Sequence, residues 1–131
     1  MSLERFLQAQ ATTYAAALSE LRAGRKTGHW IWWVFPQEPR AGTSVTSRTY
    51  ALAEAEVLLY WQHPVLGARY RECVEVVHRQ LCGEGVAPFT LMGSEVDVLK
   101  LRSSLCLFRT QVQGVDAGFA TQVSEVLARL P

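Results

Sequence analysis

Cysteine is scarce in this sequence, with only Cys73, Cys82 and Cys106 among 131 residues. An odd and irregularly spaced set argues against a disulfide framework and favours a reducing, cytoplasmic environment. Long hydrophobic runs are also missing, since no apolar stretch approaches the roughly 20 residues that span a bilayer. The first ten residues, MSLERFLQAQ, include acidic and polar residues where a signal peptide has an apolar stretch, which argues against export.

A surplus of one charge is likewise absent. Thirteen Lys and Arg residues against twelve Asp and Glu residues give a formal net charge of +1. This balance gives no general attraction to nucleic acid or to anionic membranes, so that binding of either would need a local basic patch. Arg22, Arg25 and Lys26 form only a short basic run, so we do not expect nucleic acid as a partner.

The common catalytic motifs are missing as well. The chain has no phosphate-binding P-loop, no dinucleotide-binding glycine pattern, no HExxH zinc motif and no GxSxG nucleophile elbow. His78 and Cys82 are four positions apart, which makes a two-ligand fragment without a visible third partner. We therefore expect neither a metal site nor a cofactor.

Apolar residues are plentiful, at 49% of the chain, and most of them recur at steps of three and four. This spacing is typical of amphipathic helices. It predicts helices over residues 2–23, 50–62, 64–81, 95–108 and 117–130, with a helical turn at 88–93. Ser94 and Asp97 form a candidate capping box before the fourth of these helices. The segment HWIWWVF, residues 29–35, is apolar at nearly every position, so its period leaves strand and helix open.

The stretch GRKTGHWIWWVFPQ, residues 24–37, holds three of the four tryptophans. Lysine side chains bind phosphate and tryptophan faces stack on bases, so this stretch can form one wall of a ligand pocket. The alternative is that the aromatic side chains are core and that Lys26 is solvated. His29 is suited to general acid or base chemistry, or has a structural role.

A second cluster, DVLKLRSSL, covers residues 97–105. Asp97, Lys100 and Ser104 follow one another at helical spacing, which places a polar edge beside the apolar stripe. Two adjacent serines, Ser103 and Ser104, are unfavourable inside a helix and hint that hydroxyl groups are needed there. The alternative is an ordinary surface pair between Asp97 and Lys100. The segment HPVLG, residues 63–67, is best interpreted as a corner between helices, with His63 as a hydrogen-bonding cap.

Taken in order, several blocks resemble the bacterial domain-of-unknown-function 1810 family. They are FxxAQ from Phe6, ALxELRxGRK, GHWIWxVFPQ, HPVLGxR and DxxKLRSSLxLF, which ends at Phe108. The resemblance implies a compact, all-α single domain over residues 1–131, which we expect to be a bundle of about five to seven helices. It also implies that the tryptophan segment is a helix, with one face in the core and the other beside a cleft. The family has no established reaction, some members carry a calpastatin label, and it is distantly similar to NADAR domains, which act on ADP-ribose derivatives.

Two functions stay open. In the first, which we favour, a small pocket binds or hydrolyses a nucleotide or ADP-ribose-type ligand that carries phosphate. Asp97 or His29 would then transfer the proton, and the ligand would be bound by Lys26, Trp30, Trp32, Gln37, Lys100, Ser103 and Ser104. In the second, the protein is a non-catalytic interaction module with an exposed apolar groove. The first hypothesis requires the charged residues of both clusters to reach one cavity.

Overall fold

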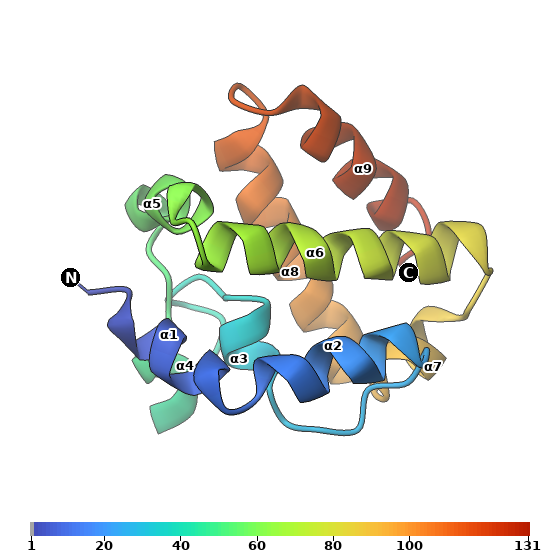
Figure 1. Ribbon diagram of the computed structural model, residues 1–131, viewed down its shortest axis with the longest axis horizontal. Coiled ribbons are helices and arrows are strands. Elements are labelled where there is room, and N and C mark those ends of the chain that lie inside the picture. Colours follow the sequence, from blue (N-terminus) through green and yellow to red (C-terminus); the bar gives the residue numbers. More distant parts are fainter. Residues whose placement is uncertain (1) are drawn as a thin grey trace.

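The regular structure is entirely helical in residues 2–131, the range that the computed structural model describes (Figure 1). The all-α prediction is therefore confirmed, but the expected five to seven helices are too few, because this range contains nine α-helices, one 3-10 helix (η1) and one π-helical turn (η2). None of these helices is both long and apolar enough to cross a membrane. Their bounds are α1 Glu4–Ala11, α2 Tyr14–Arg22, α3 Ile31–Val34, α4 Val45–Thr49, η1 Glu54–Glu56, α5 Val57–Gln62, α6 Leu66–His78, η2 Arg79–Gly83, α7 Pro88–Met92, α8 Glu95–Val112 and α9 Ala117–Leu127.

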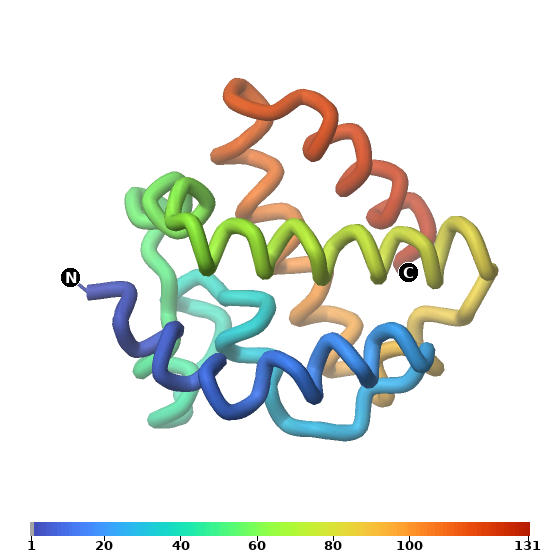
Figure 2. Tube along the Cα trace, in the orientation of Figure 1, coloured from blue at the N-terminus to red at the C-terminus, as the bar shows by residue number. Residues whose placement is uncertain are grey.

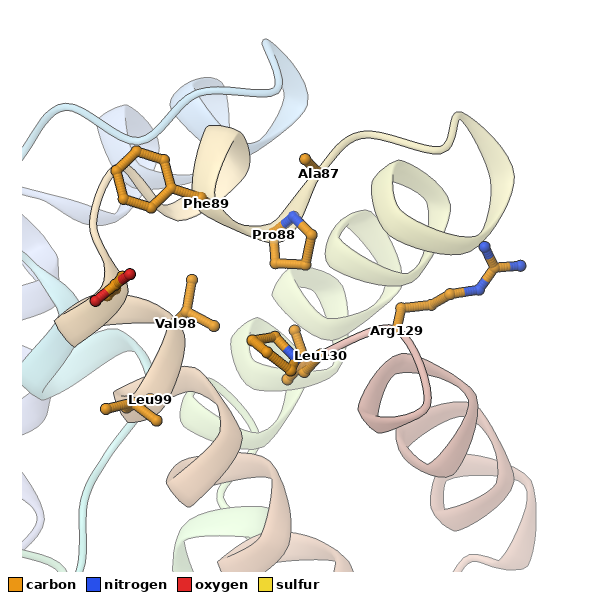
Figure 3. A pocket seen from close by; sticks show the side chains of 9 residues that line it. Ala87, Pro88, Phe89, Val98, Leu99, Arg129 and Leu130 are labelled. Carbon is orange, nitrogen blue, oxygen red and sulfur yellow. The ribbon is translucent and has the colours of Figure 1, made fainter.

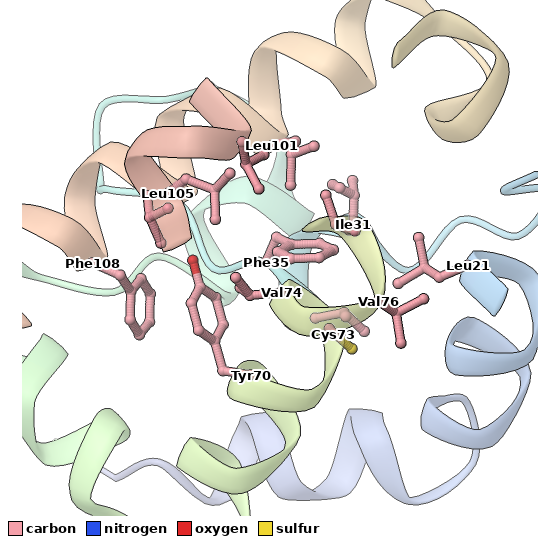
Figure 4. Packing of buried hydrophobic residues seen from close by; sticks show 14 of the residues in the cluster. Leu21, Ile31, Phe35, Tyr70, Cys73, Val74, Val76, Leu101, Leu105 and Phe108 are labelled. Atoms are coloured by element: carbon pink, nitrogen blue, oxygen red, sulfur yellow. The ribbon is translucent and has the colours of Figure 1, made fainter. Parts of the chain in front are cut away.

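Helix α6 crosses the middle of the molecule, with α2 packed on one side and α9 on another (Figures 1 and 2). Helices α8 and α9 pack against each other, and α5 and α7 also contact α8. The core lies where α2, α3, α6 and α8 meet (Figure 4). At its centre the Tyr70 ring stacks on Phe108 with 3.8 Å between centroids and 17° between planes. This stack joins α6 to α8 and so fixes the helix that carries Asp97.

The first predicted helix, over residues 2–23, is two helices in the structure. Helix α1 ends at Ala11 and α2 begins at Tyr14. The break coincides with Thr13, whose hydroxyl donates to the Ala9 carbonyl at 2.6 Å and accepts from Trp33 Nε1 at 2.9 Å. Apolar spacing continues through the break, and for that reason the sequence pattern did not reveal it.

The tryptophan segment is helical only over one turn, because α3 contains just four residues. Two further differences concern the next part of the chain. The predicted loop after Gln37 contains α4, whose first turn is capped by the Ser44 hydroxyl, which accepts from the backbone N–H of Ser47 at 3.0 Å. The helix predicted over 50–62 begins only at Glu54, as η1 followed by α5.

The corner at residues 63–67 is built as predicted. Nδ1 of His63 accepts hydrogen bonds from the backbone N–H groups of Val65 at 3.1 Å and Leu66 at 3.2 Å. The predicted capping role of this histidine is therefore confirmed. Gly67 is required by close approach rather than by flexibility. A Cβ at this position would lie 1.9 Å from the carbonyl oxygen of Trp61.

The three cysteines are free, in accord with the absence of a disulfide framework. Cys73 is buried in the core, and burial raises the pKa of its thiol to about 12. Cys82 and Cys106 are the two partly exposed cysteines. Within residues 2–131, no three His, Cys, Asp or Glu side chains are grouped as a metal site requires.

Candidate functional site

The candidate site lies where the loop after α2 meets the start of α8. The backbone N–H of Lys26 donates to the Leu91 carbonyl at 2.7 Å, which fastens this loop to α7. Gly93, with a φ of +84°, ends α7 in the left-handed conformation that glycine adopts without strain, and a Cβ there would be only 3.0 Å from the Lys26 carbonyl oxygen. Ser94 then begins α8 by accepting the Asp97 N–H at 3.1 Å. The Ser94 half of the predicted capping box is thus confirmed.

The Asp97 carboxylate contacts both lysines of the chain. Its Oδ2 is 2.7 Å from Nζ of Lys26, and its Oδ1 is 3.8 Å from Nζ of Lys100. The Lys26 side chain is only 4% exposed and that of Asp97 16%, so this is a largely buried pair. Nζ of Lys26 also donates to the Gly28 carbonyl at 2.5 Å and lies 4.9 Å from the Trp30 ring centroid. Two ammonium groups facing one carboxylate leave a net positive charge at this point.

A small hollow of about 260 Å³ opens beside this ion pair. Lys26 and Asp97 form part of its wall, and exposed His29 lies on the loop that forms another part. The two sequence clusters are thus side by side, with Lys26, His29 and Asp97 on one hollow and Lys100 bound to Asp97. The complete lining is Lys26, Thr27, Gly28, His29, Met92, Gly93, Ser94, Val96 and Asp97.

The two tryptophans predicted to bind ligand have different surroundings. Trp30 is a core residue, 3% exposed, so its ring is not available for stacking unless the core opens. Trp32 is half-buried, and Nζ of Lys100 lies 4.4 Å from its ring centroid. Any base that stacks on this face of Trp32 must therefore displace Lys100 or share the ring with it.

The remaining predicted residues lie away from the hollow. Gln37 is buried, and its Nε2 donates to the carbonyls of Phe35 at 2.9 Å and Lys100 at 2.7 Å, a structural role that ties the loop to α8. Ser104 is buried and shares a 3.0 Å hydrogen bond with the Tyr70 hydroxyl. Ser103 lines a different hollow of about 640 Å³. The adjacent serines therefore point to different surroundings, and only one of them meets solvent.

Comparison with known proteins agrees with the blocks of sequence and with this fold. The family described as "Protein of unknown function (DUF1810)" matches residues 1–128. The chain belongs to the DUF1810 family. The conserved hypothetical protein Rv1873 from Mycobacterium tuberculosis has a similar crystal structure, with 36% sequence identity and a TM-score of 0.86 over 98% of this chain and 86% of that one. No curated protein matches.

In this DUF1810 protein, one residue of the site was not predicted from the sequence. Glu20, on α2, accepts the backbone N–H groups of Thr27 and Gly28, both at 2.8 Å, and Nε1 of Trp30 at 3.0 Å. Burial opposes ionisation of this carboxyl, but the N–H groups of Gly28, Thr27 and Trp30 outweigh it and lower the pKa of Glu20. A signal was available, because a carboxylate in the last turn of a helix is disfavoured by the helix dipole and needs a local reason.

Proposed function

We propose that this protein binds a small phosphate-bearing ligand of the nucleotide or ADP-ribose type at the Lys26–Asp97–Lys100 cluster. The observation that carries the proposal is the Asp97 carboxylate between two lysines, which leaves one positive charge in excess beside the hollow. Charge-assisted hydrogen bonds from lysine are a strong way to hold phosphate oxygens. Lys100 is the more accessible donor, since its side chain is 22% exposed against 4% for Lys26.

The size of the hollow limits how much of the ligand it can take. Sites for complete small molecules have volumes of about 300–1,000 Å³, so about 260 Å³ suits a phosphate or a sugar phosphate rather than a whole dinucleotide. The rest of the ligand would extend over the surface towards Trp32. When phosphate draws Lys100 away from the ring, the base can stack on the exposed part of Trp32.

Hydrolysis of the ligand is the catalytic form of the same proposal. His29 is exposed at the hollow and can transfer a proton to or from a ligand there. Asp97 lines the same hollow, where its carboxylate is the second group that can exchange a proton with a ligand or stabilise positive charge on a sugar. Product formation from ADP-ribose or NAD, measured by chromatography, would separate hydrolysis from binding alone.

The experiment that tests binding is titration calorimetry with ADP-ribose, AMP, NAD and pyrophosphate, together with thermal shifts. A ligand at 100 times its Kd stabilises the folded state by about 2.7 kcal/mol. We expect Lys100→Met to weaken binding at least about tenfold, the scale of one charge-assisted hydrogen bond. Arg79→Met removes one positive charge from an exposed position on η2 and should bind like the wild type. Absence of binding by all four compounds at millimolar concentration would refute the proposal.

A second candidate, an interaction module, is favoured by one observation. A mostly apolar groove of about 620 Å³ runs between α7, α8 and the residues after α9 (Figure 3). Phe89 and Leu99 line it and are 57% and 59% exposed, although both are large hydrophobic residues. A partner that co-purifies with the wild type and with Lys100→Met but not with Leu99→Glu would support this function. A partner lost from both variants alike would contradict it.

A further inference from the structure

The loop of residues 23–30, between α2 and α3, contains no regular structure and yet has a defined shape. It carries Lys26 and His29, so its conformation decides whether the hollow exists. One of its fastenings is the Lys26 N–H bond to the Leu91 carbonyl, which holds the loop against α7. This bond fixes the side of the loop that faces α7. The other side faces α2 and needs contacts of its own to have one conformation.

On the side that faces α2, Glu20 is the residue of α2 whose side chain accepts hydrogen bonds from the loop. A single oxygen of its carboxylate, Oε1, accepts from Thr27, Gly28 and the Trp30 indole. The donors are two consecutive backbone amides, of Thr27 and Gly28, and the indole N–H of Trp30. Their convergence on one oxygen is an anion-binding arrangement, and the anion is part of the protein.

The bonds also determine where the lysine points. Gly28, held by Glu20 through its N–H, uses its carbonyl to accept Nζ of Lys26 at 2.5 Å. Trp30, held through its indole, presents its ring 4.9 Å from the same ammonium group. Two of the three groups that Glu20 fastens are therefore groups that position Lys26 towards Asp97.

We infer that Glu20 is the positioning residue of the candidate ligand site, where it acts as an internal anion that shapes the loop carrying Lys26 and His29. It touches neither the hollow nor Asp97, so its effect on a ligand is indirect. The effect on ligand affinity rests on the proposed function. The effect on the loop does not, and can be measured without any ligand.

The test compares Glu20→Ala with Glu20→Gln. Amide hydrogen exchange by NMR reports the loop through the N–H groups of Thr27 and Gly28, with the amide of Val74, in the core, as reference for global stability. In Glu20→Ala we expect exchange at both loop amides to accelerate about tenfold or more relative to the reference, because each loses its only acceptor. Glu20→Gln keeps a carbonyl oxygen that can accept the same donors, and should restore protection to within about threefold.

Chemical rescue separates an anion site from a general packing effect. Formate at about 50 mM should slow exchange at the two loop amides of Glu20→Ala and leave the wild type unchanged, because only the variant has an empty acceptor position. Glu4→Ala is the matched control, since it removes an exposed carboxylate from α1 and should leave the loop amides protected. The affinity for ADP-ribose should fall about tenfold in Glu20→Ala and recover in Glu20→Gln.

The outcomes keep the two proposals apart. Unchanged loop exchange in Glu20→Ala overturns the positioning role, whatever the ligand does. Faster exchange with unchanged affinity also overturns it, because the loop would then be anchored without consequence for the site. If the wild type binds no ligand, the proposed function fails, and the exchange and formate data still decide whether Glu20 shapes the loop.

Discussion

Removing the charge of Asp97 and removing the charge of Lys26 should lower the free energy of unfolding by different amounts. Asp97→Asn leaves the Lys26 ammonium, 4% exposed, without its counter-ion; it keeps its contacts with a backbone carbonyl oxygen and an aromatic ring, and the new amide oxygen is a neutral acceptor. Removing one member of a buried pair costs about 3–5 kcal/mol. Because the two remaining contacts are favourable, we expect the lower end, about 3 kcal/mol.

Lys26→Met removes the charge from the more deeply buried end. The Asp97 carboxylate then keeps Lys100 at 3.8 Å and some access to water, since its side chain is 16% exposed. Methionine also fills most of the space of the lysine stem, so we expect a loss of about 1 kcal/mol. In the double variant the asparagine no longer faces an unpaired ammonium, and the two changes should couple by about 2 kcal/mol.

Urea unfolding followed by tryptophan fluorescence measures these differences, and an unchanged m-value confirms that the unfolding transition is comparable between variants. The larger loss corresponds to a fall in Tm of about 10 °C for a chain of this size. Lys100→Met is the control, because it removes only the longer contact to Asp97 and the contact with the half-buried Trp32 ring, and should cost less than about 1 kcal/mol. Equal losses from the two ends, or additivity within about 0.5 kcal/mol, would refute the reasoning from burial.

Three further predictions concern the core. Gly67→Ala should cost about 3 kcal/mol in a urea titration, since its Cβ would lie 1.9 Å from the Trp61 carbonyl oxygen and the backbone would have to shift; a loss under 1 kcal/mol would contradict this. Only the two partly exposed cysteines should react with an aromatic disulfide reagent at pH 8, with Cys73 reacting after unfolding, because its pKa is raised to about 12; three fast thiols in the native protein would be inconsistent with burial. Ser104→Ala should cost about 2 kcal/mol by leaving the buried Tyr70 hydroxyl without its partner, whereas Ser103→Ala, at the surface, should cost less than 0.5 kcal/mol in the same calorimetric scan.

Sequence patterns predicted the helices well where a single apolar stripe repeats for several turns. Helices α6 and α8 follow the predicted spans closely because their buried residues recur at three and four positions. The pattern failed where a distant side chain intervenes. At the break after α1, the Thr13 hydroxyl accepts a hydrogen bond from Trp33, a residue twenty positions away. No local sequence pattern contains that contact. The tryptophan segment is helical, as the family resemblance implied, over the single turn of α3.

The sequence predicted which residues form the site better than it predicted how deeply their side chains are buried. Lysine and aspartate side chains were identified by type. Lys26 was expected either in a pocket wall or in solvent; it does line the hollow, but its side chain is nearly buried beside Asp97. Burial depends on the partner, which lies far along the chain. Gln37 and Ser104 were candidates for ligand binding because they are polar, and the structure gives both of them buried hydrogen bonds within the protein.

The bond from Gln37 to the Lys100 carbonyl joins positions 63 residues apart, and the Lys26–Asp97 pair closes a loop of comparable length. Each contact of this span requires the entropy cost of closing a long loop to be overcome. A chain whose helices have formed but have not yet packed against one another cannot assemble the cluster of lysines around Asp97. On the proposed function, an anion bound at this cluster would therefore distinguish fully folded molecules from helical intermediates, which circular dichroism alone does not.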